Sequence, residues 1–254
     1  MKKIRIIPRL DIKGSNVVKG IHCEGLRIVG NPKDLAYKYY KEGADELLCM
    51  DIVASLYQRN LDFNFLKSLS SGIFIPITVG GGIRSINDIN SALRAGADKV
   101  AINTYAIKNP QFLNEAVKKF GSQCIVLSIE AKKRPDGGWE AYTDGGREKT
   151  GIDAVQWAKK AIKLGVGEII LTSIDHDGIR KGYDVELISA VSSFSPVPLI
   201  VHGGADKPDS FLEVLKRCRP EGLSAASIFH YGDFSIKDIK KHLFNKGFPI
   251  RYGL

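Results

Sequence analysis

Cysteine is scarce in this sequence of 254 residues, and its spacing argues against a metal or disulfide site. The four cysteines form no C-x-x-C pair, and two of them lie in apolar runs that we predict to be strands; they are Cys23, Cys49, Cys124 and Cys218. His176 stands between two aspartates, but no second histidine follows at a metal-ligand spacing. We therefore expect reduced thiols, no metal and no cofactor.

Long hydrophobic runs are also missing. No apolar stretch reaches 18 residues, and the N-terminal segment Met-Lys-Lys-Ile-Arg-Ile-Ile-Pro-Arg is too short and too charged for a signal peptide. These two absences predict a cytoplasmic protein that does not enter a membrane.

The charge is strongly positive, with a formal net value of +9, but it is not gathered into one stripe. The lysines are spread over predicted helix faces and loops, which is unlike a nucleic-acid-binding surface. With 44% hydrophobic and 26% charged residues, the chain suits a globular protein with a large core. We expect small anionic substrates and no nucleic acid.

A glycine-rich stretch occurs twice and reveals an internal repeat. Pro76–Arg84 reads Pro-Ile-Thr-Val-Gly-Gly-Gly-Ile-Arg, and Pro198–Ala205 reads Pro-Leu-Ile-Val-His-Gly-Gly-Ala. Each stretch predicts a strand that ends in a turn, and such glycine turns can direct successive backbone N–H groups at an anion. A tight turn alone would need the same glycines. Two such cradles on opposite halves imply a substrate with two anionic ends.

The repeat sets the fold prediction. Gly43-Ala-Asp-Glu-Leu-Leu and Gly165-Val-Gly-Glu-Ile-Ile have nearly the same spacing as the two glycine stretches. Each half contains four strand-like runs that alternate with helical runs. Eight such units in 254 residues predict one domain over residues 1–254, a (β/α)₈ TIM barrel built from two duplicated half-barrels.

Two acidic residues end corresponding strands of the two halves. In the strand predicted at Ile4–Asp11, Ile4, Ile6, Pro8 and Leu10 alternate with inward-facing Arg5, Ile7, Arg9 and Asp11. Glu130 ends the strand predicted at Ile125–Glu130 with the same inward direction. Barrel enzymes build their sites at this end of the strands, so Asp11 and Glu130 are candidate catalytic residues. A strand-capping carboxylate is the alternative.

Two long connections and several polar residues border the same end of the predicted barrel. We expect Asn16–Asn31 to be a lid loop without structure of its own, and Ala131–Lys149 to form a hairpin over the mouth. Asn103 and Thr104 end another predicted strand and are suited to hold a phosphate oxygen, while Asp175 and Asp177 lie in the loop that follows the strand predicted at Glu168–Thr172.

The motifs together resemble the cyclase subunit of imidazole glycerol phosphate synthase, from histidine biosynthesis. The likeness covers nearly the whole chain, in segments such as Leu-Asp-Ile-Lys, Thr-Val-Gly-Gly-Gly-Ile, Gly-Ala-Asp-Lys-Val, Leu-Thr-Ser-Ile-Asp and Ser-Ile-Phe-His. In that family a glutaminase partner makes ammonia, which travels through the barrel and reacts at the mouth with a substrate that carries two phosphates. The resemblance implies a heterodimer with a glutaminase.

The resemblance also implies residue roles. It makes Asp11 and Glu130 the general acid and base. The implied substrate- and phosphate-binding residues are Lys19, Gly81, Gly82, Asn103, Thr104, Asp175, Asp177, Gly203, Gly204, Ala226 and Ser227. The implied ammonia gate at the other end of the barrel is Arg5, Glu46, Lys99 and Glu168, although a purely structural ring would have the same sequence. Asp98 and Gln123 match positions that dock the glutaminase.

The departures from the family pattern all lie at the mouth. Glu130 stands where the family has aspartate, and a displacement of about 1 Å is enough to slow a positioned reaction. Arg9 replaces a residue that is usually cysteine. His202 and Gly145 replace serines, and Ile179 replaces a threonine.

Three other functions remain open at this point. The altered mouth fits a paralogue that helps to convert an acetamido group to an acetamidino group on a nucleotide-linked sugar for surface polysaccharides. A single-chain aminoaldose isomerase shares the duplicated halves, but the gate and docking residues argue against it. The last alternative is a non-catalytic activator of a glutaminase.

Overall fold

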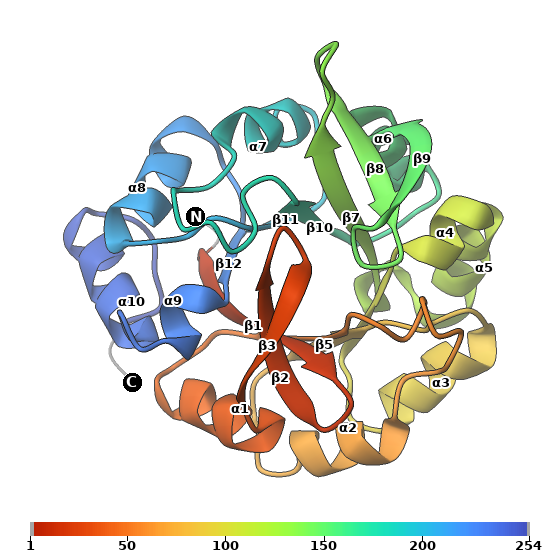
Figure 1. Ribbon diagram of the computed structural model, residues 1–254, viewed down its shortest axis with the longest axis horizontal. Coiled ribbons are helices and arrows are strands. Elements are labelled where there is room, and N and C mark those ends of the chain that lie inside the picture. Colours follow the sequence, from red (N-terminus) through yellow and green to blue (C-terminus); the bar gives the residue numbers. More distant parts are fainter. Residues whose placement is uncertain (1–2, 253–254) are drawn as a thin grey trace.

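The computed structural model describes residues 3–252, and eight parallel strands in it form a closed barrel (Figure 1). Around the barrel, neighbouring strands pair in the order β1, β4, β5, β6, β7, β10, β11, β12 and back to β1. Their bounds are β1 Arg5–Lys13, β4 Leu47–Asp51, β5 Ile77–Gly80, β6 Lys99–Ile102, β7 Ile125–Lys133, β10 Glu168–Ser173, β11 Leu199–His202 and β12 Gly222–Ala225. The predicted (β/α)₈ barrel is confirmed. That residues 1–254 form one domain stays a prediction, and residues 1–2 and 253–254 lie outside the described part.

Helices form the outer ring of the barrel (Figure 1). They are α1 Pro32–Lys41, α2 Phe63–Ser70, α3 Ile86–Arg94, α4 Thr104–Lys108, α5 Gln111–Phe120, α6 Ala154–Lys163, α7 Val185–Ser192, α8 Pro208–Arg217, α9 Ser227–His230 and α10 Ile236–Asn245, with a 3₁₀ turn, η1, at Ser122–Cys124. Helix α3 begins with a capping box. The Ser85 hydroxyl accepts from the backbone N–H of Asp88, and the Asp88 carboxylate accepts from the backbone N–H of Ser85.

The alternation along the strands divides the interior into two apolar clusters. Ile6 and Leu10 of β1 belong to the large core between the barrel and the helices. Ile7 belongs to a second cluster inside the barrel. The same holds for β7, where Ile125 and Leu127 face the helices. Side chains of a strand point alternately to opposite faces. Arg9, Asp11 and Glu130 alternate with the residues that face the helices, so they point into the barrel, as predicted.

The prediction that Asn16–Asn31 is a loop without structure of its own is wrong. This segment forms two antiparallel strands, β2 Asn16–Ile21 and β3 Glu24–Gly30. Strand β1 continues beyond the barrel rim to Lys13, and its last residues, Asp11–Lys13, supply the ladder to which β2 pairs. In Figure 1 this hairpin lies across the centre of the ring, over the mouth.

The second half of the barrel also has a hairpin that pairs with an extended barrel strand. Strand β7 also continues beyond the rim, to Lys133, and pairs with β8 Trp139–Thr143, which pairs with β9 Glu148–Asp153. The hairpin predicted at Ala131–Lys149 is therefore confirmed, with its second turn and strand extending to Asp153. A hairpin after the first strand of each half agrees with the duplication seen in the sequence. Among residues 3–252, no helix is long and apolar enough to cross a membrane.

Candidate active site

Four charged residues close the floor of the barrel, at the amino ends of the strands. Both cations reach both carboxylates. Arg5 contacts Glu46 at 2.6 Å and Glu168 at 2.5 Å, while Lys99 contacts Glu46 at 2.7 Å and Glu168 at 2.6 Å. Burial alone would lower the pKa of Arg5, but Glu168 and Glu46 outweigh it and raise the pKa. The structure thus brings the four predicted gate residues together in one closed ring of alternating sign.

An apolar layer lies inside the barrel between this ring and the mouth. It is a separate cluster of buried side chains from six strands, namely Ile7, Leu48, Met50, Ala101, Val126, Ile170 and Ile200. None of these side chains is charged, although the buried Ser224 lies opposite Ile7 in the pairing of β1 with β12. The bore therefore has a charged floor, a mostly apolar middle and a polar mouth.

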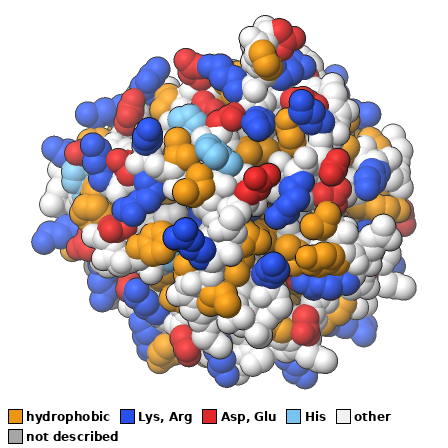
Figure 2. Space-filling view, in the orientation of Figure 1, with side chains coloured by type: hydrophobic (Ala, Val, Ile, Leu, Met, Phe, Trp, Pro, Cys, Tyr) orange, Lys and Arg blue, Asp and Glu red, His pale blue; other side chains and the backbone are white. Residues whose placement is uncertain are grey.

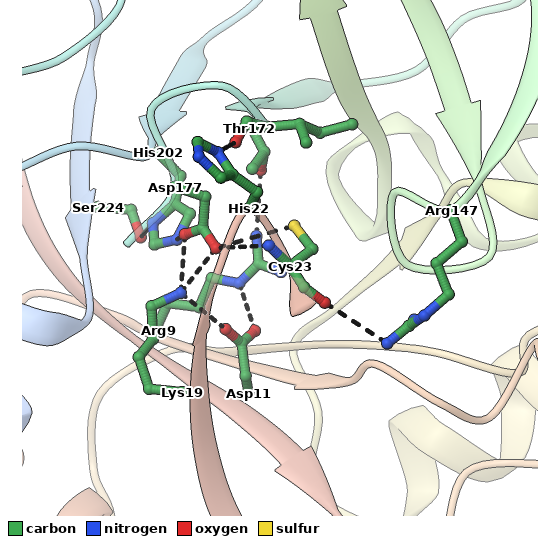
Figure 3. Close-up of polar contacts among 11 residues, drawn as sticks. Arg9, Asp11, Lys19, His22, Cys23, Arg147, Thr172, Asp177, His202 and Ser224 are labelled. Carbon is green, nitrogen blue, oxygen red and sulfur yellow. Dashed lines mark hydrogen bonds and ion pairs between the residues drawn. The ribbon is translucent and has the colours of Figure 1, made fainter. Parts of the chain in front are cut away.

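Arg9 is the central cation of the mouth (Figure 3). Its Nε donates to Oδ1 of Asp11 at 2.7 Å, and its Nη1 donates to the Thr172 hydroxyl at 3.1 Å. The other oxygen of Asp11, Oδ2, lies 3.9 Å from Nζ of Lys19. Burial alone would raise the pKa of Asp11, but Arg9 and Lys19 outweigh it and lower the pKa. Asp11 is therefore a carboxylate at neutral pH.

The surroundings of Glu130 favour its protonated form, whereas those of Asp11 favour the ionised form. It is buried, and the Nδ2 of Asn103 donates to its Oε2 at 3.0 Å. Burial raises the pKa of Glu130 to about 7, with Arg9 opposing part of the rise. Two carboxyl groups with pKa values on opposite sides of their usual range can act as proton donor and proton acceptor near neutral pH. The predicted catalytic pair thus differs in the way that acid–base chemistry requires.

The raised pKa of Glu130 predicts a pH-dependent gain in stability from Glu130→Gln. A raised folded-state pKa means that wild-type stability from this group is full at low pH and is lost as the pH rises from about 4.5 to about 7. The neutral glutamine escapes this loss. We expect equal free energies of unfolding near pH 4, and a variant more stable by up to about 3 kcal/mol at pH 8. Urea denaturation across this range measures it, and a constant difference between variant and wild type would contradict it.

The first glycine turn borders a cavity of about 440 Å³. Gly81 and Gly82 have φ values of 103° and 70°, which favour glycine. A Cβ on Gly81 would lie 2.2 Å from the carbonyl oxygen of Asp51, so a side chain does not fit there. Asn103, Thr104, Glu130 and Arg9 also line this cavity. Four predicted site residues therefore share one open space with Glu130.

Two of these residues are held by protein groups. The Nδ2 of Asn103 donates to Glu130 and to the carbonyl oxygen of Tyr142, each at 3.0 Å, while its Oδ1 is buried without a partner. The Thr104 hydroxyl accepts from the backbone N–H of Asp144 at 3.0 Å. Sequence reasoning assigned Asn103 to a phosphate and missed that it orients Glu130, because strand order does not reveal side-chain partners.

The second glycine turn is almost filled by protein side chains. Gly203 and Gly204 have φ values of 105° and 97°, as in the first turn, but the space beside them holds only about 10 Å³. The Nζ of Lys19 lies 2.8 Å from both carboxylate oxygens of Asp177, and Nε2 of His202 lies 3.5 Å from Oδ1. Ala226 and Ser227 line this space, as predicted. The two predicted anion cradles therefore have the same backbone conformation, but the first borders an open cavity and the second is filled by protein side chains.

The ionisation states of the filled cradle follow from these contacts. Burial alone would raise the pKa of Asp177, but His202 and Lys19 lower it well below its usual range. Burial and the nearby Arg9 lower the pKa of His202, whose Nδ1 lies 3.2 Å from the Ser224 hydroxyl. Lys19 and Asp177 are thus a buried ion pair beside a neutral imidazole.

The turn of the β2–β3 hairpin rests on this cluster (Figure 3). His22 and Cys23 have φ values of 51° and 63°, which side-chain-bearing residues rarely adopt. The backbone N–H of His22 donates to the carbonyl oxygen of Asp177 at 2.8 Å, and its Nδ1 lies 3.0 Å from the carbonyl oxygen of Ile174. Arg147 of the second hairpin donates to the carbonyl oxygen of Cys23 at 3.4 Å. The sequence did not identify these contacts.

The remaining predicted residues lie apart from the cavity. Asp175 accepts from the backbone N–H of Lys133 through its carboxylate. At the other end of the barrel, Asp98 accepts from the backbone N–H of Ile77, and Gln123 lies in η1. No set of three or more metal-ligating side chains occurs in residues 3–252. On the face shown in Figure 2, lysines and arginines are spread among acidic side chains.

Comparisons with known proteins agree on one family. Residues 5–235 match the histidine biosynthesis protein family. The chain is 56% identical over 211 residues to the imidazole glycerol phosphate synthase subunit HisF of Legionella pneumophila, covering 83% of this chain and 100% of that protein. It is 46% identical to the subunit of the same name from Streptococcus mutans, over 99% of this chain and 100% of that protein. The subunit of the same name from Clostridium botulinum is 48% identical, over 97% of this chain and 98% of that protein.

Proposed function

The chain belongs to the histidine biosynthesis protein family, and from that premise we propose that it is the ammonia-using cyclase subunit of an imidazole glycerol phosphate synthase. Its relatives are named as subunits, and the partner we propose is a glutaminase that forms a heterodimer with this chain. The substrate we propose is a small molecule with anionic ends, in keeping with the cytoplasmic location expected from the sequence.

One observation carries the proposal: a charged ring and a reactive cavity lie at opposite ends of one apolar bore. Ammonia released by a partner at the floor would pass the ring of Arg5, Glu46, Lys99 and Glu168 and then the apolar layer. It would reach the mouth as a neutral molecule and a nucleophile. The ring serves as the gate in this proposal, and Asp98, beside Lys99, belongs to the docking face together with Gln123.

The proposed chemistry assigns one role to each carboxyl group. Addition of ammonia to a carbonyl, loss of water and ring closure with C–N cleavage all need proton transfers in both directions. Glu130, with its raised pKa, donates the proton, and ionised Asp11 accepts one at its Oδ2. One anionic end of the substrate binds at Gly81, Gly82 and Thr104.

The second anionic end has to displace protein groups. The proposed site consists of Gly203, Gly204, Ala226 and Ser227, and the Lys19–Asp177 pair now fills it. Lys19 lies on β2, so movement of the β2–β3 hairpin would withdraw its ammonium from Asp177 and offer it to a phosphate. Asp175 and Asp177 are the acidic members of the proposed binding set.

The filled cradle favours a second candidate function. Gly203 and Gly204 border a space of only about 10 Å³, whereas Gly81 and Gly82 border a cavity of about 440 Å³, and His202 and Arg9 add bulk at the mouth. A nucleotide-linked acetamido sugar, which an ammonia-using subunit would convert to an acetamidino sugar, needs one anion site and not two. The same gate and the same partner would serve this reaction.

Turnover of the purified chain tests the function directly. The assay supplies excess ammonium at alkaline pH and the bisphosphorylated formimino intermediate of histidine biosynthesis, and it follows the loss of substrate absorbance. We expect turnover with ammonium alone, and turnover with glutamine only when the glutaminase is present. A folded protein that binds the glutaminase but leaves the intermediate unchanged would rule out the cyclase and make sugar amidination the leading function.

A further inference from the structure

Arg9 is the group that β1 presents to the reactive cavity. Arg9 lines the cavity of about 440 Å³, and Asp11, the neighbouring inward residue of the same strand, is not among the lining residues described. Arg9 is only 3% exposed, so nearly all of its side chain is shielded from bulk solvent. A substrate that occupies the cavity beside Glu130 therefore meets Arg9.

The hydrogen bonds of Arg9 leave one donor free. Nε is used by Asp11 at 2.7 Å and Nη1 by Thr172 at 3.1 Å. Nη2 has no hydrogen-bond partner among residues 3–252, and it is not among the fully buried polar atoms that lack one. Two protein contacts thus fix the plane of the guanidinium while its remaining nitrogen is available to a ligand.

The charge of Arg9 is permanent. Burial alone would lower its pKa, but Asp11, Asp177 and Glu130 outweigh burial and raise the pKa above its ordinary value. Arg9 therefore cannot act as a proton donor in a reaction at neutral pH. It can stabilise negative charge, which a preorganised donor in a water-poor site does efficiently.

We propose that Arg9 is a further substrate-contacting residue, and that its guanidinium binds the carbonyl oxygen of the substrate to which ammonia adds. This inference rests on the proposed function. As the lone pair of ammonia forms the C–N bond, the π electron pair of the carbonyl group moves to oxygen, and that oxygen becomes negative beside Arg9. The oxygen then takes the proton of Glu130, and the nitrogen gives one of its protons to Asp11.

The proposal also explains why a buried arginine is tolerated in the bore. Asp11 and Thr172 lie on strands β1 and β10, and together they hold the guanidinium in one orientation. Asp11 thereby has a second task, because its Oδ1 positions Arg9 while its Oδ2 stays available to accept a proton. The contact would select substrates whose reacting carbonyl lies at the inner end of the cavity, with an anion at the first glycine turn.

The test compares Arg9→Met with wild type in the ammonium-dependent assay, without a glutaminase. Methionine keeps an unbranched side chain in the bore but has no N–H donor. Loss of one such donor typically lowers kcat by about 10²–10³-fold, and we expect a loss of this size with a smaller change in KM. Arg217→Met is the matched control, because Arg217 is exposed on α8 and its one ion pair within residues 3–252 is with Glu213. The control is expected to keep wild-type rates.

Two further readouts separate a substrate contact from an indirect effect. If Arg9 acted only by lowering the pKa of Glu130, Arg9→Met would keep Glu130 protonated to a higher pH, so the pH profile of kcat would shift upward while its maximum stayed close to that of wild type. We expect the maximum of the profile to fall instead. In Arg9→Ala, added guanidinium ion is expected to restore turnover at least tenfold, because it can occupy the vacated donor position; a purely structural defect would not respond.

The outcomes are distinguishable. Arg9→Met within threefold of an active wild type, or a pH profile that is shifted but keeps the wild-type maximum, would overturn the contact and leave the cyclase function standing. Wild-type protein that fails to convert the intermediate would overturn the proposed function, and the contact with it. If circular dichroism shows Arg9→Met to be unfolded, Arg9→Lys decides instead, since lysine keeps the cation without the planar fork; a rate within threefold of wild type would overturn the contact.

Discussion

Asp11→Asn is expected to lower ammonium-dependent turnover by about 10²–10⁴-fold, the range typical of a lost general base. The carboxylate of Asp11 is held ionised by Arg9 and Lys19, and only Oδ1 is engaged in a close hydrogen bond. Asparagine has nearly the same shape, but its amide accepts no proton at neutral pH. Steady-state kinetics with ammonium and the histidine-pathway intermediate measure the loss.

The partner's glutamine hydrolysis provides the control for this variant. Asp11 lies at the mouth, far along the bore from the floor ring, so Asp11→Asn is expected to stimulate a bound glutaminase as well as wild type does. Asp209→Asn, an exposed aspartate on α8, is expected to keep both activities. A non-catalytic activator would stimulate glutamine hydrolysis but would have no product-forming step to lose. Full product formation by Asp11→Asn would therefore remove Asp11 from the catalytic pair.

Glu46→Ala is expected to lower the free energy of unfolding by about 3–5 kcal/mol, as for other broken buried ion pairs. Glu46 is 1% exposed and accepts from Arg5, Lys99 and the Thr78 hydroxyl, the last at 2.6 Å. Alanine leaves two cations at the barrel floor with Glu168 as their one remaining carboxylate in the ring. Urea denaturation followed by circular dichroism measures the change.

An exposed glutamate supplies the comparison. Glu213 is 58% exposed and contacts Arg217 at 3.4 Å across one helical turn. Exposed pairs of this kind contribute about 0.2–1 kcal/mol, so Glu213→Ala is expected to change stability by less than 1 kcal/mol. Similar losses for the two variants would mean that the floor ring is screened by solvent. It would then be too weakly held to act as a closed gate.

Strand alternation is the part of the site that the sequence predicted best. The inward direction of Arg5, Arg9, Asp11 and Glu130 follows from a period of two, which depends only on local backbone geometry. The four gate residues were identified from the family resemblance, and their place at one end agrees with the structure, in which each of them begins a strand or directly precedes one. Local periodicity therefore predicted the inward direction of the charges at the mouth, and the resemblance predicted the gate.

The prediction of an unstructured lid at Asn16–Asn31 was wrong because the strands there depend on a tertiary contact. Gly20, Gly25 and Gly30 gave Asn16–Asn31 the composition of a loop. A two-stranded ribbon has little stability alone, and here β2 is stabilised by pairing with the part of β1 that rises above the rim. That pairing depends on where β1 leaves the barrel, which no local pattern specifies.

The sequence by itself determined the duplicated barrel, the glycine turns and the side of each strand on which charges lie, because these follow from periodicity and backbone freedom. Only the tertiary structure decided what those charges do. Arg9 and Thr172 are 163 residues apart in the chain, and Lys19 and Asp177 are 158 apart. Burial and partners set ionisation, so the raised pKa of Glu130, the ionised state of Asp11 and the filling of one of two equivalent cradles all arise from contacts between distant segments.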